Sequence, residues 1–306
     1  MNKQELHNKL NELENWVVPT LDASISHGDM PGDKVIVHEA NVAIANMIFP
    51  LLIDEIKKAD SEKVVVSIFG CSGSGKTVTS SILYEYFKQA GIGVYLMSGD
   101  NYPRRIPMYN DAERISIFRS NGLKGMLAEG VYTVENQKVL DDLWEKEIDS
   151  DPSLCGTYPW LASYQKAGRA ALKKYLGTFE EQDYDEINGV LKAFKEGNEK
   201  IFLKKMGRKE SERWYEEVDF SGINVLMLEW THGNNENLKY IDIPLLLNST
   251  PEETKAYRVF RARDDGADSA FVTMVLEIEQ ESLDARAKFA KIIMSKNGEV
   301  LDPRDF

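Results

Sequence analysis

The residues best suited to chemistry in this sequence lie in one glycine-rich octapeptide, Gly70-Cys71-Ser72-Gly73-Ser74-Gly75-Lys76-Thr77. It matches the pattern G-x-x-x-x-G-K-[ST] in full. The glycines allow backbone N–H groups to approach a polyphosphate closely, and a following helix adds the partial positive charge of its N-terminus. Lys76 supplies a cation for the β- and γ-phosphates, and the Thr77 hydroxyl is suited to ligate Mg²⁺. The octapeptide therefore predicts a nucleotide-binding loop, with ATP and Mg²⁺ as its expected ligands.

The segments on both sides of this loop have the arrangement that the motif requires. Residues 63–69, KVVVSIF, form a β-branched run typical of a buried parallel strand. Residues 77–90 have helical spacing and end before Gly91, a residue typical of helix ends. This context disfavours a purely structural glycine turn. Within the loop, a small loop-filling role is expected for Cys71 rather than that of a reactive thiol.

Further strands alternate with helices along the chain. Buried strands are predicted in GVYLMSGD, INVLMLEW and YIDIPLLLN, and two exposed, antiparallel strands in IFLKKMGR and ERWYEEVDF. Residues 35–58 are expected to be a helix broken or kinked at Pro50, and residues 251–294 are expected to be helical. The pattern predicts an α/β protein with the P-loop NTPase fold: a doubly wound, mainly parallel sheet with helices on both faces.

Two regions stand outside this alternating pattern. Residues 1–60 are predicted to be a helical N-terminal extension packed on the core. Residues 61–306 are predicted to be the P-loop domain, interrupted at about 132–217 by a charged, mostly helical insertion.

Composition excludes several classes of protein. The chain has 306 residues, 42% of them hydrophobic, and a formal net charge of −13, so it is expected to be globular and to bind neither nucleic acid nor anionic membranes broadly. Its two cysteines cannot form a disulfide scaffold or a Cys/His metal site. The polar N-terminus lacks the apolar core of a signal peptide. We therefore expect a cytoplasmic protein, with a homodimer as the default assembly.

A second charged segment, Ser98 to Arg105, follows the strand after the loop helix. In a doubly wound sheet the carboxyl end of that strand faces the same crevice as the phosphate loop. Asp100 is there suited to accept a proton from an acceptor hydroxyl. Tyr102, Arg104 and Arg105 are candidates to hold the acceptor, because guanidinium groups bind phosphates bidentately.

Two later segments add acidic and basic candidates. Glu229 ends a buried strand, where a carboxylate is suited to bind Mg²⁺ through water, and the nearby His232 is a weaker candidate for binding the acceptor. Arg261 and Arg263 lie on a predicted helix before Asp264-Asp265-Gly266. Such cations are suited to a lid that neutralises charge during phosphoryl transfer. A solvated helix face is the alternative interpretation for them.

The content and order of these segments resemble the phosphoribulokinase/uridine kinase superfamily. Gly99-Asp100-Asn101-Tyr102 resembles that family's GDS-type segment, and Glu229-Trp230-Thr231-His232-Gly233 resembles its EGLHG segment, with Trp-Thr in place of Gly-Leu. Arg261 and Arg263 resemble its lid. The resemblance covers roughly residues 63–130 and 218–290. It implies Asp100 as catalytic base and Glu229 as a second acid near Mg²⁺, beside Lys76, which the phosphate-loop motif itself marks as a catalytic cation.

The resulting hypothesis is a small-molecule kinase. It would move the ATP γ-phosphate to a hydroxyl of a small, anionic metabolite such as a sugar phosphate. A GTPase is disfavoured because no Asn-Lys-x-Asp motif is present, and a helicase-type ATPase because the chain is acidic. Two alternatives remain: an adenylylsulfate kinase, which shares a GDN segment, and a nucleotide-dependent regulatory NTPase with a protein partner.

Overall fold

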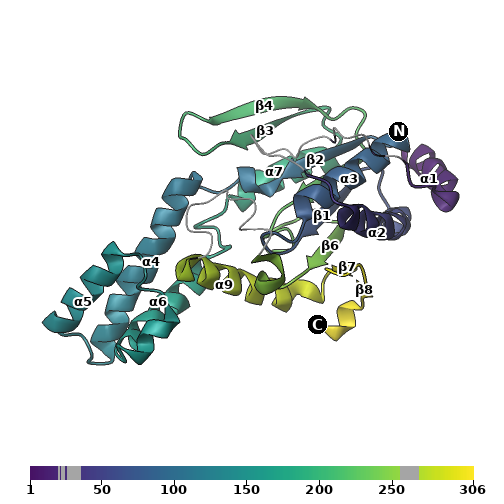
Figure 1. Ribbon diagram of the computed structural model, residues 1–306. Helices are drawn as coiled ribbons and strands as arrows, with labels where there is room; N and C mark the ends of the chain where they lie inside the picture. Colours follow the sequence, from purple (N-terminus) through teal and green to yellow (C-terminus); the bar gives the residue numbers. More distant parts are fainter. Residues whose placement is uncertain (20, 22–24, 26–35, 256–268) are drawn as a thin grey trace. The chain divides into compact units, whose positions relative to one another are not determined.

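The computed structural model describes residues 1–306 except 20, 22–24, 26–35 and 256–268. The chain forms two compact units (Figure 1). The first unit comprises Met1–Tyr102, Asp183–Thr250 and Ser282–Phe306, and the second comprises Pro103–Gln182 and Pro251–Glu281. Within the described ranges, no helix is long and apolar enough to cross a membrane.

The first unit is built on a six-stranded sheet with the strand order β2-β5-β1-β6-β7-β8. The strands are β1 (Val64–Phe69), β2 (Val94–Ser98), β5 (Val225–Glu229), β6 (Ile243–Asn248), β7 (Ile292–Ser295) and β8 (Val300–Leu301). All neighbouring pairs are parallel except β7 with β8. The chain crosses from β1 to β2 and returns to β5 between them, so the predicted doubly wound, mainly parallel sheet is confirmed.

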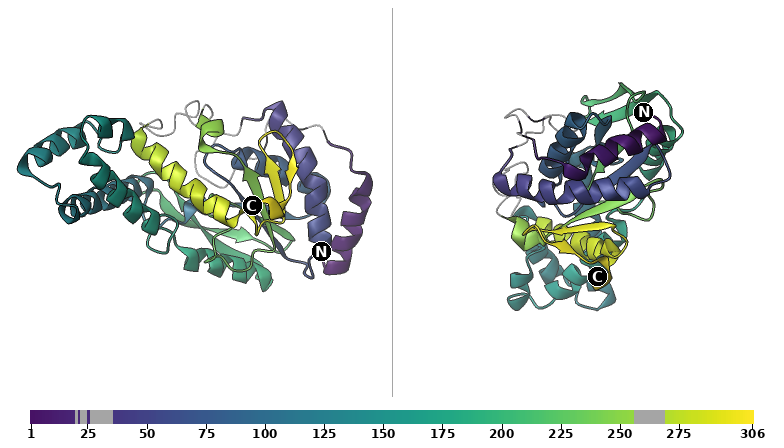
Figure 2. Two further views of the ribbon diagram at one scale, coloured as in Figure 1. Left: turned by 90° about the horizontal axis from the view of Figure 1, so that it is seen from below. Right: turned by 90° about the vertical axis from the view of Figure 1, so that its right-hand side faces the viewer.

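Helices cover both faces of this sheet, and the alternation of strand side chains decides which helices they meet. Val64, Val66 and Ile68 face α1 (Lys3–Glu12), α2 (Glu39–Lys58) and α3 (Lys76–Gln89), which share one hydrophobic cluster with them. Val65 of β1, with Leu226 and Leu228 of β5, faces α7 (Tyr184–Lys195) in a second cluster. Figure 2 shows α1 and α2 side by side on their face of the sheet. Each large apolar side chain buried in this way stabilises the fold by about 1.5–3 kcal/mol.

The described part of residues 1–60 contains the helices α1 and α2, and α2 runs without interruption through Pro50. A break at Pro50 is therefore excluded, and a kink there stays a prediction. The helix is held on both sides of the proline by core contacts: before it, the Phe49 ring lies 5.4 Å from that of Tyr86 and the Tyr86 hydroxyl donates to Asn46 at 2.5 Å, and after it Leu52 and Ile53 are buried. Tertiary packing here outweighs the local cost of a proline inside a helix, about 3 kcal/mol.

An antiparallel hairpin, β3 (Lys200–Met206) and β4 (Arg213–Asp219), forms a separate two-stranded sheet in the first unit. This confirms the prediction of two antiparallel strands. The predicted exposure is confirmed for β4, which is exposed along most of its length, but it is wrong for β3, which is largely buried.

The expectation that residues 251–294 are helical is wrong at its end. The helix α9 (Ala270–Ala287) stops before a short parallel strand, β7, that pairs with β6. Ile292, Ile293 and Met294 are all buried. A four-residue strand at the edge of the parallel sheet is too short to show the two-residue alternation of a strand. Its apolar residues therefore look like a continuation of the preceding helix in the sequence.

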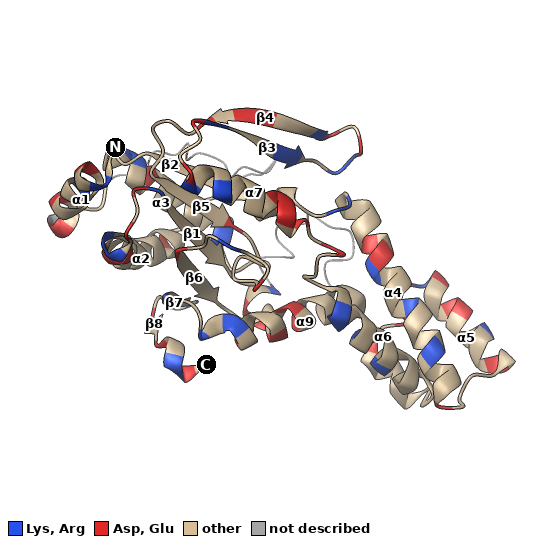
Figure 3. Ribbon diagram, turned by 180° about the vertical axis from the view of Figure 1, so that it is seen from behind, with Lys and Arg blue, Asp and Glu red and all other residues tan. Residues whose placement is uncertain are grey.

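The second unit consists mainly of helices: α4 (Pro107–Ala128), α5 (Val134–Glu145), α6 (Leu161–Tyr175) and the first part of α9. Its core centres on Phe118, whose ring meets those of Tyr164 at 5.3 Å and Phe271 at 5.6 Å. Figure 3 shows Lys and Arg interspersed with Asp and Glu over α4, α5 and α6, as expected for solvated helix faces.

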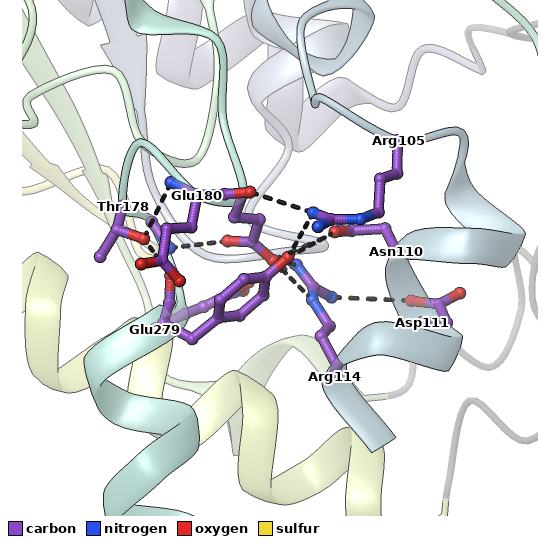
Figure 4. Close-up of polar contacts among 10 residues, drawn as sticks. Arg105, Asn110, Asp111, Arg114, Thr178, Glu180 and Glu279 are labelled. Atoms are coloured by element: carbon purple, nitrogen blue, oxygen red, sulfur yellow. Dashed lines mark hydrogen bonds and ion pairs between the residues drawn. The ribbon is translucent and has the colours of Figure 1, made fainter. Parts of the chain in front are cut away.

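A buried ion pair ties α4 to the turn that follows α6 (Figure 4). The Glu181 side chain is fully buried; it accepts from Arg114 Nε at 2.7 Å and from the Gly177 backbone N–H at 2.6 Å. Glu279 of α9 lies 3.7 Å from the same guanidinium. Burial acts to lower the pKa of Arg114, but the carboxylates of Glu181 and Glu279 outweigh it, so this pKa is raised. The network holds α4, α9 and the turn at 177–181 together.

We expect Arg114→Met to destabilise the protein by roughly 3–5 kcal/mol, because it leaves the buried Glu181 carboxylate without its cation. Urea unfolding followed by circular dichroism measures this loss. Adding Glu181→Gln to the same chain removes the stranded charge and should recover part of the stability. Arg213→Met, on the exposed strand β4, is the matched control. Equal stability of the Arg114 and Arg213 variants would contradict the importance of the buried pair.

Candidate active site

The phosphate loop links β1 to α3 and has the backbone geometry that the motif requires. Gly70 has a φ of +154°, and a β-carbon there would lie 2.5 Å from the Leu247 carbonyl oxygen and 2.9 Å from Ser74 Oγ. No other residue fits this position without a shift of the backbone. Lys76 and Thr77 are both buried, and the Lys76 ammonium donates to the carbonyls of Gly70 at 3.0 Å and Cys71 at 3.1 Å.

The loop residues fit a polyphosphate. Ser74 Oγ is buried and has no hydrogen-bond partner among the residues that the structure describes, so it is an available donor within the loop. The first turn of α3 begins at Lys76, and its N-terminal N–H groups and partial positive charge are directed into the same loop. Cys71 is buried and its Sγ lies 3.2 Å from the Ser249 carbonyl oxygen, which is the loop-filling role expected from the sequence. The chain has the P-loop fold.

Glu229 and Thr77 come together at the carboxyl end of β5. The Thr77 hydroxyl donates to Glu229 Oε1 at 3.3 Å, and the Glu229 side chain is buried. In the described part of the chain, no group of three His, Cys, Asp or Glu side chains could hold a metal by itself. One hydroxyl and one carboxylate suit Mg²⁺, which keeps several waters and shares phosphate oxygens with its nucleotide.

Sheet register places Asp100 near the same edge. Ser98, the last residue of β2, pairs with Glu229, and Ile68 of β1 pairs with Glu229 on the other side. Asp100 follows Ser98 by two residues, is exposed, and its backbone N–H donates to Ser98 Oγ at 3.3 Å. The predicted carboxyl-end crevice therefore brings together the segments that carry Lys76, Asp100 and Glu229.

The turn that carries Asp100 is held on two sides. A β-carbon on Gly99 would lie 2.2 Å from Trp230 Cγ, so this glycine lets the turn pack directly against the tryptophan. Asn101 is fully buried, and its Oδ1 accepts the Met206 backbone N–H of β3 at 3.0 Å. Nothing in the local sequence indicates the contribution of β3, because the two segments are more than 100 residues apart.

Tyr102, a predicted acceptor-binding residue, is fully buried. Its hydroxyl accepts the Lys204 backbone N–H at 3.3 Å, and the Lys204 ammonium lies 5.5 Å from its ring centre and 3.0 Å from Glu186. Burial raises the pKa of the Tyr102 phenol, which therefore stays protonated. These contacts show a structural position for the ring, and its role in acceptor binding stays a prediction.

Arg104 and Arg105 belong to the second unit. Arg104 Nε donates to the Phe179 carbonyl, and Arg105 donates to the Glu180 carbonyl at 3.0 Å and to the Tyr175 hydroxyl at 3.1 Å. Figure 4 shows Arg105 directed toward this turn. Both guanidinium groups thus hold backbone of their own unit in this structure.

The remaining predicted residues lie at the edge of the site or outside the described chain. His232 is half-buried and its ring contacts Trp230 edge-on, with centroids 5.2 Å apart. This contact supports the loop after β5. The predicted lid residues Arg261 and Arg263 fall within 256–268, outside the described residues.

Comparison with known proteins identifies one informative relative. No family model matches the chain. A bifunctional alpha-galactosidase/sucrose kinase, AgaSK, from Mediterraneibacter gnavus is 40% identical over 240 residues, which cover 78% of this chain and 21% of that protein. The chain thus spans about a fifth of the length of this relative, and it is homologous to that part. The predicted resemblance to small-molecule kinases is confirmed to this extent.

Solved structures with related architecture are more distant. A D-glycerate 3-kinase from Cryptococcus neoformans aligns over 87% of this chain and 98% of its own, with 12% identity and a TM-score of 0.47. A protein described as a possible uridine kinase, from Bacillus stearothermophilus, aligns over 82% of this chain and 96% of its own, with 14% identity and a TM-score of 0.43.

Proposed function

We propose that this chain is an ATP-dependent kinase that transfers the γ-phosphate to a hydroxyl of a sugar. The observation that carries the proposal is the alignment of three strand ends in one sheet. It puts a P-loop with a buried lysine, a carboxylate bonded to the P-loop threonine, and an exposed aspartate along the edge where β1, β5 and β2 lie side by side. Phosphoryl transfer needs a cation that binds the phosphates, a ligand for Mg²⁺ and a group that orients the acceptor hydroxyl.

Each residue has a defined task in this reaction. ATP with Mg²⁺ supplies the phosphoryl group and neutralises much of its charge. Lys76 and the N-terminus of α3 bind the phosphates, and Thr77 with Glu229 holds the metal. Asp100 orients the acceptor hydroxyl and accepts its proton, while the acceptor oxygen forms the new bond to phosphorus and ADP leaves. In a loose transition state the proton moves late, so alignment by Asp100 contributes more than its basicity.

The relative supports a sugar as the acceptor. Any continuous stretch of 240 residues in a chain of 306 contains residues 67–240, and therefore the P-loop, Asp100 and Glu229. The homologous part of AgaSK thus aligns with the segments that carry these residues, and sucrose kinase is the activity named for that protein which uses a nucleotide. Arg104 and Arg105 donate to carbonyls of their own unit, so a neutral sugar replaces the sugar phosphate as our preferred acceptor. We place the enzyme in the cytoplasm, where ATP is available.

ADP release from ATP with Mg²⁺ across an acceptor panel tests the proposal. The panel contains sucrose, free hexoses and pentoses, their phosphates, nucleosides and adenylylsulfate. We expect stimulation by sucrose or another neutral sugar. Stimulation by adenylylsulfate alone would establish the alternative kinase. ATP binding with no stimulation by any acceptor, together with capture of a protein partner, would favour a regulatory NTPase.

Glu229→Gln should raise the Mg²⁺ concentration needed for half-maximal activity. The amide keeps the size of the side chain and its hydrogen bond to Thr77 but removes the negative charge that attracts the cation. We expect a shift of about tenfold, equivalent to about 1.4 kcal/mol. Activity measured over a Mg²⁺ titration gives the shift, with Glu236→Gln, in the exposed loop after β5, as control. Identical titration curves for the two variants would contradict the metal role.

A further inference from the structure

The N-terminal extension lies beside the phosphate loop. A β-carbon on Gly75, the residue before α3, would lie 3.4 Å from Asn41 Nδ2 in the first turn of α2. The Asn41 Oδ1 accepts the His38 backbone N–H at 3.3 Å, and this bond holds the side chain at the start of the helix. The extension therefore reaches the loop that is suited to bind phosphates.

The same helix also reaches the edge of the sheet that β7 and β8 form. A β-carbon on Gly298, in the turn between β7 and β8, would lie 3.4 Å from the Met47 sulfur. Six residues separate Asn41 from Met47, a rise of about 9 Å along a helix. Asn41, Ile44 and Met47 are three residues apart, so they follow one side of α2. This row joins the phosphate loop to the β7–β8 turn.

Strand order indicates the direction in which a bound nucleotide would extend. Glu229 and the Asp100 turn lie on the β5 and β2 side of β1, and in the proposed reaction the γ-phosphate points toward them. The base is at the opposite end of the nucleotide, so an extended nucleotide would project it toward the β6 and β7 side. That is the side where Met47 meets the β7–β8 turn.

The side chains of the row suit a purine. Met47 is 44% exposed although it is a large apolar residue, and Ile44 is half-buried, with part of its side chain packed against the core cluster and part exposed. A thioether and a branched aliphatic group both pack well against the flat face of an aromatic ring. The Asn41 amide, next to Gly75, is placed to contact the sugar or the first phosphate.

From this arrangement we propose that α2 forms one wall of the nucleotide-base site, with Ile44 and Met47 contacting the base and Asn41 lying beside the loop. The inference rests on the nucleotide site of the proposed function. It gives the N-terminal extension a direct part in nucleotide binding, which neither the P-loop motif nor the similarity to other kinases assigns to it.

Calorimetric binding of ADP and of tripolyphosphate to the full chain tests this proposal. Both probes present phosphates to the loop, but only ADP carries a base. Met47→Ala should weaken ADP binding about fivefold, the scale of losing an apolar contact, and leave tripolyphosphate binding unchanged. Ile44→Ala should act in the same way. Met108→Ala, which truncates an exposed methionine of α4 in the second unit, is the matched control and should change neither probe.

The outcomes separate this inference from the proposed function. Unchanged ADP affinity in both the Met47 and Ile44 variants would overturn the base wall. Equal weakening of ADP and tripolyphosphate would overturn it as well, since that pattern reports damage to the phosphate loop. If the unaltered chain bound neither probe, the nucleotide site itself would be wrong and the proposed function would fail with it.

Discussion

Replacing Lys76 with alanine should reduce kcat/KM for ATP by at least ~100-fold, whichever acceptor is used. Two losses combine in this variant. The cation that binds the β- and γ-phosphates disappears, and the bonds from the ammonium to the Gly70 and Cys71 carbonyls, which hold the loop closed, disappear with it. Steady-state ADP release at varied ATP concentration measures the effect.

Lys88→Ala is the matched control for this prediction. Lys88 lies on the same helix, α3, but its side chain is 63% exposed and its partner Glu85 is 3.8 Å away. An exposed pair of this kind contributes little, so the control should keep its activity and its stability. Thermal unfolding of both variants separates a loss of phosphate binding from a loss of fold. If Lys76→Ala were as active as Lys88→Ala, the octapeptide would not be the site of phosphoryl transfer.

The sequence predicts those parts of the candidate site that depend on residues close together in the chain. The octapeptide, the strand before it and the helix after it form one continuous segment, so their types and spacing suffice. Glu229 and Asp100 are predicted as site residues because the first ends a buried strand and the second lies two residues after one, and the ends of neighbouring parallel strands meet at one edge. The pairing of Ser98 with Glu229 shows that this reasoning held for the sheet.

The features that the sequence did not predict depend on contacts between distant segments. Asn101 is held by β3, and Asn41 lies beside Gly75, yet nothing in either local sequence indicates these partners. Arg104 and Arg105 are predicted to bind an anionic acceptor from their charge and from their place after the β2 strand, and in the structure they donate to carbonyls of a nearby turn. A guanidinium group binds carbonyls and phosphates with the same donors, so only the fold shows which it meets.

Asp100→Asn should lower kcat by ~100-fold or more while the affinity for ADP stays the same. The amide has nearly the shape of the carboxylate, but it cannot take the proton of the acceptor hydroxyl and offers N–H groups in place of one oxygen. The turn is held by Gly99 against Trp230 and by Asn101 against β3, so the substitution should not move it. Steady-state turnover with a stimulating sugar, combined with calorimetric ADP binding, separates the two effects.

Asp54→Asn, on an exposed position of α2, is the control with the same chemical change, and it should retain full turnover. Full turnover by Asp100→Asn as well would remove Asp100 from the reaction and leave the P-loop to act with a different base. A parallel loss of ADP affinity would instead assign Asp100 to nucleotide or metal binding. A fall in kcat with unchanged ADP affinity is expected of a residue that acts on the acceptor or on the transferred phosphoryl group rather than on the ADP part of the nucleotide. This result would connect the exposed aspartate at the end of β2 to the chemical step.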